Sequence, residues 1–323
     1  MAWQMVEHEL EMLLDGKGVD EPAKYDVAPE MLQPVKLRKN VNYIVVAVIL
    51  NEQKEVLMIQ EAKEECYGRW YLPAGRMELN ETIIEAMKRE VQEETGLNCE
   101  ARTLLAVQEH GPSWIRFVFL SEITGGTLKT TKEADAESLQ AAWWDRTTTL
   151  PLRAPDIHPL IKLALQYHEN PSHPLLMPHE TAYAVVSQRF LITFTSSAED
   201  VWVMVSNQSS YHLPVTASGS TFAESRHSTM SAMNRLLKRL LPEVKVNIRG
   251  VLALQHLGKS EAGGADGVCL NVLVSITHSL ASSDTAPPGI IGEGFEWFLV
   301  PQGAVKSQLL QRLSANTVVT LHS

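Results

Sequence analysis

The stretch from Gly75 to Leu97 reads GRMELNETIIEAMKREVQEETGL, and it decides the fold of the first half of the chain. At about 100° per residue, its apolar side chains fall in one arc of a helix that we expect to run from Glu81 to Thr95. Glu90 and Glu94 lie inside that apolar arc, and Glu93 lies at its edge. The helix therefore turns three carboxylates towards the sheet on which its apolar face should pack.

Three partly buried like charges are costly unless a cation neutralises them. Carboxylate oxygens suit Mg²⁺ or Mn²⁺, which proteins hold together with substrate phosphates. Upstream, Pro73-Ala74-Gly75 enters a tight loop that can offer a backbone carbonyl to a metal ion and let a phosphate approach closely. The competing interpretation is a merely solvated acidic helix face, but the helical periodicity gives it little support.

The stretch resembles the Nudix box, the signature of the Nudix hydrolase superfamily. All nine positions that the signature constrains match at fixed spacing: Gly75, Glu81, Arg89, Glu90, Val91, Glu93, Glu94, Gly96 and Leu97. The resemblance implies an α+β fold, an α/β/α sandwich around a mixed sheet, and hydrolysis of nucleoside diphosphates linked to another group. Asn80 stands where the family commonly has Gly, and since Asn tolerates left-handed backbone better than most residues, we expect the loop to be retained.

The resemblance also implies roles for individual residues. It implies a metal site for Mg²⁺, with Mn²⁺ as the alternative, made by Glu90, Glu93, Glu94 and the carbonyl of Ala74. Arg89 joins these carboxylates in the implied catalytic set, where it pairs with Glu81 and orients the helix. Metal ions in such sites neutralise the diphosphate and lower the pKa of an attacking water, and Glu93 is the preferred group to take its proton. Gly75, Glu81 and Gly96 are expected to be structural.

Three strings before, at the start of and after the box narrow the resemblance to Nudix enzymes that hydrolyse 8-oxo-guanine nucleoside diphosphates. They are Leu37–Val41, Trp70–Glu78 and Gly111–Trp114. This implies hydrolysis of oxidised purine nucleoside diphosphates, such as 8-oxo-dGDP and 8-oxo-GDP, to the monophosphate and phosphate. Neither spacing nor composition indicates this specificity. An ADP-ribose or other nucleoside-diphosphate pyrophosphatase stays open, because Pro112 lies where such enzymes often carry a proline beyond the box.

A pocket for the base needs an apolar or aromatic platform and a few polar groups. Leu57 and Trp143, with Trp144 as the alternative to its neighbour, are the candidates for the platform. Glu137, with Glu133 and Asp135 of the same acidic loop, is a candidate for a polar contact to the base or for a further metal ligand. Gly75 is placed to let the substrate phosphate approach. The competing roles are sheet packing for the apolar residues and a solvated loop for Glu137.

The second half of the chain repeats the element order of the first. Leu104–Gln108 is similar in sequence to Val251–Gln255, and Tyr71-Leu72-Pro73 is similar to His212-Leu213-Pro214. The region that should match the box, residues 216–241, contains one acidic residue, Glu224. We therefore expect a degenerate Nudix-like domain without a metal site, which covers the first domain, binds a protein partner or supports self-association.

The predicted organisation has three parts: an N-terminal helix and linker over residues 1–34, a catalytic domain over 35–170, and the degenerate domain over 180–323. The proline-containing stretch 168–179 is the expected linker between the two domains.

The composition, 45% hydrophobic and 20% charged, is typical of a globular protein. A net charge of −10 argues against binding a nucleic-acid polymer, whose phosphates need clustered Lys and Arg. Three cysteines without a C-x-x-C pair favour a reducing compartment, and the longest apolar run, Tyr43–Leu50, is too short to span a membrane. We expect a soluble, intracellular, cytoplasmic protein whose partner is a small nucleotide.

Overall fold

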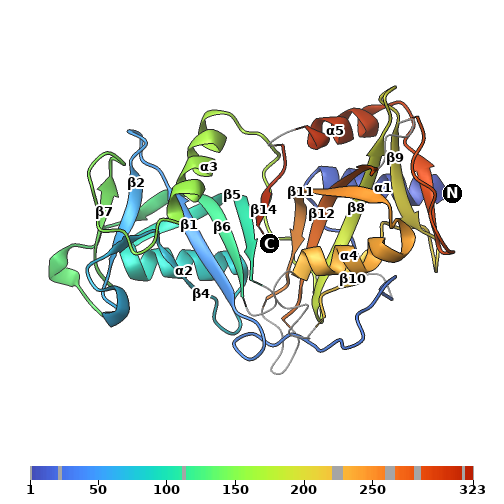
Figure 1. Ribbon diagram of the computed structural model, residues 1–323. Coiled ribbons are helices and arrows are strands. Elements are labelled where there is room, and N and C mark those ends of the chain that lie inside the picture. The colour runs from blue at the N-terminus through green and yellow to red at the C-terminus, as the bar shows by residue number, and fades with distance from the viewer. Residues whose placement is uncertain are drawn as a thin grey trace.

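The computed structural model describes residues 2–20, 24–110, 114–219, 228–258, 266–279, 285–314 and 317–322, and it has two halves that lie side by side (Figure 1). The elements of the first half are β1 (Tyr43–Ile49), β2 (Val56–Glu61), β3 (Trp70–Tyr71), β4 (Ala74–Arg76), α2 (Ile83–Thr95), β5 (Leu97–Glu109), β6 (Ile115–Gly126), β7 (Ser138–Trp144) and α3 (Ile157–Glu169). The fold is the predicted α+β type.

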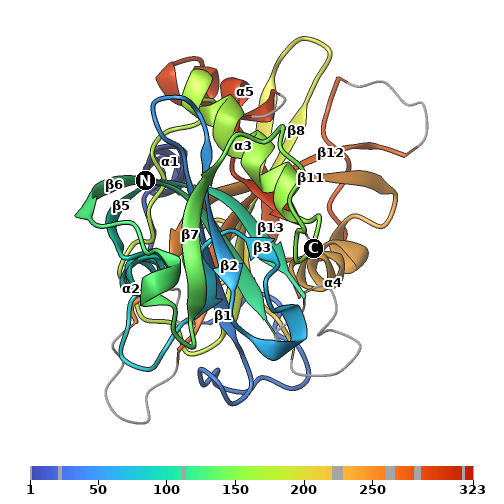
Figure 2. The ribbon, with the colours of Figure 1, turned by 90° about the vertical axis from the view of Figure 1, so that its left-hand side faces the viewer.

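The first half has two sheets, and the larger one carries the site. Its strand order is β14-β5-β6-β1-β4, with β1 parallel to β6 and antiparallel to β4. The smaller sheet, β3-β2-β7, is antiparallel throughout. Helices α2 and α3 lie on opposite sides of these strands (Figure 2), which gives the expected sandwich around a mixed sheet.

The apolar runs 42–50 and 55–60, separated by the polar stretch 51–54, predict a hairpin, and this prediction is wrong. Strands β1 and β2 exist, but they belong to different sheets and meet only at the bridge between Leu50 and Val56 among the described residues. The reason is the burial of β1 on both faces: Val45 packs in the core cluster of α2, whereas Val46 packs in the cluster of α3. Such a strand is central in its sheet, and its two edges are taken by β4 and β6.

The second half repeats most of this topology. Its elements are β8 (Val186–Thr195), β9 (Val201–Ser206), β10 (Val215–Ala217), α4 (Ser228–Leu240), β11 (Val244–Gln255), β12 (Val268–His278), β13 (Phe295–Leu299) and α5 (Ala304–Leu313). Strand β8 is parallel to β12 and antiparallel to β10, as β1 is to β6 and β4. The pairs β11–β12 and β9–β13 likewise repeat the antiparallel pairs β5–β6 and β2–β7. The strings Leu104–Gln108 and Val251–Gln255 therefore lie in equivalent strands, and Tyr71–Pro73 and His212–Pro214 directly precede the equivalent strands β4 and β10. The two halves differ in that β8 and β9 pair, which joins the strands of the second half in one sheet.

Each end of the chain packs against the half that is more distant from it in the sequence. Helix α1 (Ala2–Leu14) packs into the core of the second half, where Leu10 and Leu13 join Leu191 and Val203. Strand β14 (Thr320–His322), which the sequence analysis did not foresee, adds to the edge of β5 in the first half. In Figure 1 the C-terminus accordingly lies between the two halves. Among the described residues, no helix is both long and apolar enough to cross a membrane.

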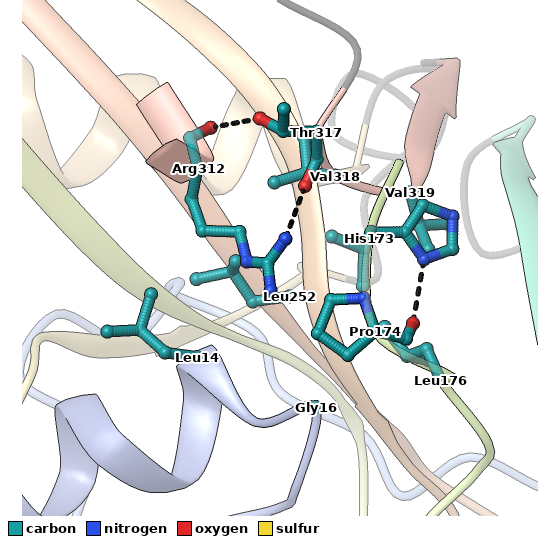
Figure 3. Close-up of a pocket in the computed structure, with 11 residues that line it drawn as sticks. Leu14, Gly16, His173, Pro174, Leu176, Leu252, Arg312, Thr317, Val318 and Val319 are labelled. Carbon is teal, nitrogen blue, oxygen red and sulfur yellow. Dashed lines mark hydrogen bonds between the residues drawn. The ribbon is translucent and has the colours of Figure 1, made fainter. Parts of the chain in front are cut away.

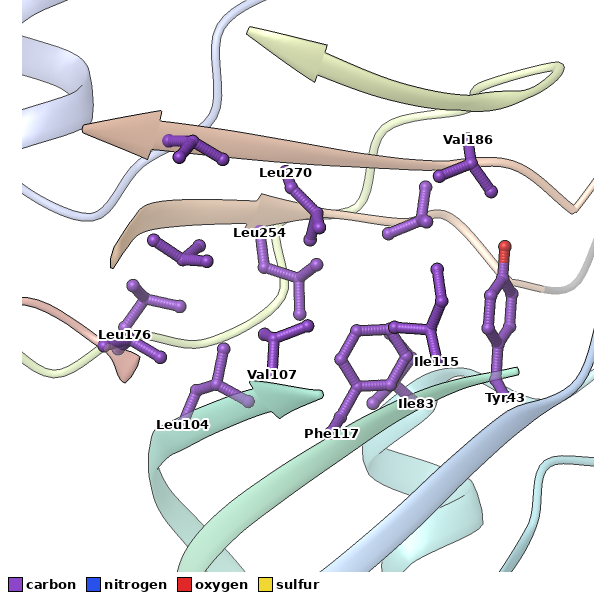
Figure 4. Close-up of a cluster of buried hydrophobic side chains, with 14 of the residues drawn as sticks. Tyr43, Ile83, Leu104, Val107, Ile115, Phe117, Leu176, Val186, Leu254 and Leu270 are labelled. Atoms are coloured by element: carbon purple, nitrogen blue, oxygen red, sulfur yellow. The ribbon is translucent and has the colours of Figure 1, made fainter. Parts of the chain in front are cut away.

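One hydrophobic cluster runs through both halves. In Figure 4, Val107 and Phe117 of the first half face Leu254 and Leu270 of the second, and Tyr43 lies beside Val186. All these side chains are buried. The second half is therefore docked on the face of the first that α2 covers. Burial of this shared apolar surface opposes separation of the two halves.

Candidate active site

Local sequence sets the ends of α2. The side chain of Thr82 accepts a hydrogen bond from the Glu85 amide, and the Glu85 carboxylate accepts one from the Thr82 amide, which makes a capping box. The helix therefore begins at Ile83, and Glu81, predicted as its first residue, lies in the preceding loop. Gly96 closes the helix with φ of 74°, as predicted, and Asn80 has the left-handed φ of 65° that its position demands.

The three carboxylates of α2 lie in different environments. Glu90 and Glu94 are buried, with 7% and 1% of their surface exposed, whereas Glu93 is partly exposed. Burial raises the pKa of Glu90 and raises that of Glu94 well above its usual range. An amide hydrogen bond from Ala74 to Oε2 of Glu94, 2.9 Å long, offsets part of this effect. These burial levels follow the predicted helical arc.

Arg89 connects the carboxylates to the loop. Its Nε and Nη2 donate to the two carboxylate oxygens of Glu81 at 2.5 and 3.0 Å, which is the predicted pair. Its Nη1 donates to Glu90 at 2.8 Å and to Glu93 at 3.0 Å. The hydrogen bond with Glu81 is the main reason why the pKa of Arg89 is raised. Burial opposes the shift at Glu81, but the bonds from Arg89 and from the Glu78 amide lower its pKa.

Gly75 is placed directly against the carboxylate of Glu90. A Cβ built on Gly75 would lie 1.9 Å from Cδ of Glu90, far inside any real contact. A side chain at residue 75 would therefore displace the Glu90 carboxylate from its present place. The loop carrying Ala74 and the carboxylates of α2 are thus brought together, as the sequence predicted.

The donor set fits a divalent cation. Two buried carboxylates with raised pKa values, a third at the rim and a nearby backbone carbonyl are oxygen ligands of the kind that Mg²⁺ and Mn²⁺ take. No three His, Cys, Asp or Glu side chains among the described residues already converge on one point. The carboxylates of Glu90 and Glu93 instead accept hydrogen bonds from the guanidinium of Arg89.

The residues predicted for the base pocket differ in their exposure and in the face of the sheet on which they lie. Leu57 and Trp143 are direct cross-strand partners on the α2 side, but Leu57 is fully buried and only Trp143 is partly exposed. Trp144 faces α3 instead, where its indole donates to the Thr148 carbonyl at 2.7 Å. Glu137 is exposed. Pro112 lies outside the described residues.

Lys129, which the sequence analysis did not single out, anchors the acidic loop to the helix. Its side chain is 6% exposed, and Nζ donates to the Glu93 carbonyl at 3.0 Å and to Asp135 at 2.6 Å. Asp135 also accepts from the amides of Glu137 and Ser138, so it holds the loop rather than facing a ligand. A lone lysine after a Gly-rich turn carries no sequence signal for this role.

Two charged residues near the carboxylates were also missed. Lys63 is exposed, and its positive charge lowers the pKa of both Glu90 and Glu94, although burial is the larger effect on each. Glu61 is 1% exposed and pairs with Arg153 at 2.7 Å, while its Oε2 has no partner among the described residues. Glu61 lies opposite Ser138, whose hydroxyl donates to the Glu94 carbonyl.

The cavity drawn in Figure 3 lies elsewhere. It is lined by residues that include Leu14, His173, Arg312 and Val318, and none of its lining residues belongs to α2 or to the loop before it. Its volume is about 10 Å³, roughly enough for one water molecule. This cavity cannot accept a nucleotide.

The equivalent place in the second half has the opposite charge. Within the described part of α4 there is no acidic residue, and Arg235 contacts β10 through Thr216 and the Ala217 carbonyl, much as Glu90 approaches β4. Lys238 and Arg239 are exposed. The sequence predicts a helix over 225–241; its first residues, 225–227, and Glu224 lie outside the described residues.

Comparisons with known proteins agree with the geometry of the first half. Residues 42–163 match the family described as NUDIX domain. The chain is 51% identical to a human protein named 8-oxo-dGDP phosphatase NUDT18, with 100% of each chain covered. It is 44% identical to the Danio rerio protein of that name, over 99% of this chain and 98% of the other. A solved NUDIX hydrolase from Nitrosomonas europaea has 26% identity and a TM-score of 0.36, covering 44% of this chain and 78% of its own.

Proposed function

We propose that this chain, which belongs to the Nudix hydrolase family, hydrolyses oxidised purine nucleoside diphosphates of the 8-oxo-dGDP and 8-oxo-GDP type to the monophosphate and phosphate. The observation that carries the proposal is the 51% identity, over the whole of both chains, to a human protein named 8-oxo-dGDP phosphatase. The carboxylates of α2 support the proposal, because they suit the divalent cation that such a hydrolysis uses. Such a reaction would remove damaged nucleotides before they are used.

In this proposal Glu90, Glu93 and Glu94 hold Mg²⁺ or Mn²⁺ together with the carbonyl of Ala74. When bound, the ions would neutralise the diphosphate and lower the pKa of the attacking water. Arg89 holds the carboxylates of Glu90 and Glu93 close to each other, because its Nη1 donates to both.

Glu93 is the proposed group that takes the proton from the attacking water. It is the most exposed of the three carboxylates, so water can reach it, and Arg89 fixes its orientation through the 3.0 Å hydrogen bond. Lys63 is proposed to face the substrate phosphates, since its positive charge lowers the pKa of both Glu90 and Glu94, against the larger effect of burial.

Trp143 is the proposed platform for the base, because it is partly exposed on the face of the smaller sheet that α2 shares. Leu57 supports the indole from within the core as its cross-strand partner. Gly75 lets the phosphate approach the helix closely, and Glu137 is proposed to contact the base from the exposed loop.

We further propose that the second half is a degenerate Nudix-like domain without a metal site, with the catalytic domain over 35–170 and the second domain over 180–323. Helix α4 carries Arg235 where α2 carries Glu90, and repulsion there would oppose cation binding. A protein partner or a second copy of the chain remains the proposed use of its outer surface.

A substrate panel tests the proposed activity. Phosphate and pyrophosphate release would be measured with Mg²⁺ from 8-oxo-dGDP, 8-oxo-dGTP, GDP and ADP-ribose. We expect phosphate from the oxidised diphosphate at the highest kcat/KM. Preferential cleavage of ADP-ribose would retain the hydrolase chemistry and overturn the proposed substrate.

A further inference from the structure

We infer that the second half positions the catalytic helix of the first half, and that Gly258 is the positioning residue at the point of contact. Gly258 is buried and follows β11, in the segment His256–Gly258 that we call the β11 exit. The inference rests on the proposed role of the α2 carboxylates in metal binding.

The contact is a close approach of backbone to backbone. A Cβ built on Gly258 would lie 2.5 Å from the carbonyl oxygen of Glu81 and 2.9 Å from Cα of Thr82. Gly258 also has φ of 63°, a left-handed conformation that side chains disfavour. Only glycine therefore lets the β11 exit lie against the start of α2.

Glu81 transmits the contact to the site. Its carboxylate binds Arg89 with two hydrogen bonds, and the same Arg89 binds Glu90 and Glu93. A displacement of the Glu81 backbone must therefore move Arg89 or break its bonds. Either change alters the positions of two of the three carboxylates that would bind the cation.

The β11 exit is itself held in place by the first half. Tyr43 of β1 meets His256 edge to face, with ring centroids 5.4 Å apart at 85°. The Tyr43 hydroxyl donates to the carbonyl of Asp266 at 2.6 Å, and the Leu37 amide donates to the Asp266 carboxylate at 2.9 Å. Figure 4 shows the Tyr43 ring at this end of the shared core. The contact with Glu81 thus belongs to a packed interface.

The reciprocal contact supports this interpretation. Glu109, at the end of β5, accepts hydrogen bonds from the Thr229 amide and hydroxyl at 3.2 and 2.7 Å at the start of α4. Strands β5 and β11 are equivalent, as are helices α2 and α4. Each half therefore uses the end of the same strand to hold the start of the other half's helix, which is the self-complementary pattern of a two-fold interface.

The test replaces Gly258 with alanine in the full chain. The Cβ forces a shift of about 0.9 Å to reach the 3.4 Å of ordinary contact with the Glu81 carbonyl. Because catalytic groups misplaced by ~1 Å can lose about 10²-fold, we expect Mn²⁺ to bind roughly tenfold more weakly and kcat/KM to fall about tenfold to a hundredfold. Mn²⁺ binding is measured by calorimetry without substrate, and turnover with 8-oxo-dGDP.

Gly292→Ala is the matched control, since Gly292 has φ of 96° but a Cβ there meets nothing within 4 Å. It should keep wild-type Mn²⁺ affinity and turnover. Unchanged affinity in Gly258→Ala would overturn the inference. Fewer Mn²⁺ sites with an unchanged Kd would overturn it too, because that result indicates lost folded protein rather than a moved site.

A milder variant decides the question should Gly258→Ala fail to fold. Tyr43→Phe keeps the ring against His256 but removes the bond to Asp266, and it should weaken Mn²⁺ binding about twofold to fivefold. Wild-type affinity in that variant would overturn the inference. If Mn²⁺ binding weakens as expected but wild-type protein does not cleave 8-oxo-dGDP, the proposed substrate fails and the positioning role stands.

Discussion

Replacing Gly75 with alanine should remove most of the activity while leaving the fold in place. The new Cβ would lie 1.9 Å from Cδ of Glu90, so that carboxylate must move by about 1.5 Å to reach the 3.4 Å of ordinary contact. Since ~1 Å of misplacement can cost about 10²-fold, kcat/KM should fall by roughly two orders of magnitude, or about 2.7 kcal/mol of transition-state stabilisation.

The assay follows phosphate release from 8-oxo-dGDP over a range of Mg²⁺ concentrations, with melting temperatures recorded on the same samples. The displaced atoms are the flexible end of a side chain, so the free energy of unfolding should change by less than about 1 kcal/mol. Gly289→Ala is the control, because a Cβ there meets nothing within 4 Å. Wild-type turnover in Gly75→Ala would refute the placement of Glu90 in the site, and equal losses in both variants would refute the steric reason.

Three further predictions concern stability. Thr82→Ala removes the capping box of α2 and should lower the unfolding free energy by about 1 kcal/mol in thermal melts, whereas Ala at the exposed Thr149 should leave it unchanged. His256 is buried and its pKa is lowered by burial to about 4, so protonation of the unfolded chain below pH 6.5 costs folded stability. Between pH 7 and 5 the free energy of unfolding of the wild-type protein should fall by about 2 kcal/mol more than that of His256→Phe, as measured by urea titration. Equal losses in the two proteins would contradict this prediction. Deleting residues 318–323 removes β14 and should speed amide exchange along β5; unchanged exchange would show that β14 contributes no protection.

The short-range features of the site could be predicted from the sequence. The burial of Glu90 and Glu94, the left-handed Asn80 and the cap at Gly96 each follow from helical periodicity or backbone preference within a few residues. The pairing of Arg89 with Glu81 came from the family resemblance, and the structure contains it. These features depend on neighbours along the chain.

Features that depend on distant partners could not be predicted. The separation of β1 and β2 into two sheets is decided by which strands compete for the edges of β1, and no local pattern records that competition. Lys129 holds the acidic loop by donating to a backbone carbonyl and to a loop carboxylate, and neither contact produces a periodic pattern in the sequence. The strand pairing of β14 and the approach of Gly258 to Glu81 likewise arise only when the two halves dock.

The most direct test of the account is the rate of phosphate release from 8-oxo-dGDP by the wild-type chain and by Glu93→Gln, with Mg²⁺ and with a chelator. Glu93 is partly exposed, so glutamine should fold normally, and we expect turnover to fall by about 10²-fold or more while the melting temperature is retained. Wild-type release should stop with the chelator and return with Mg²⁺. Full activity of Glu93→Gln, or release that ignores the chelator, would contradict the assignment of the α2 carboxylates as the catalytic site.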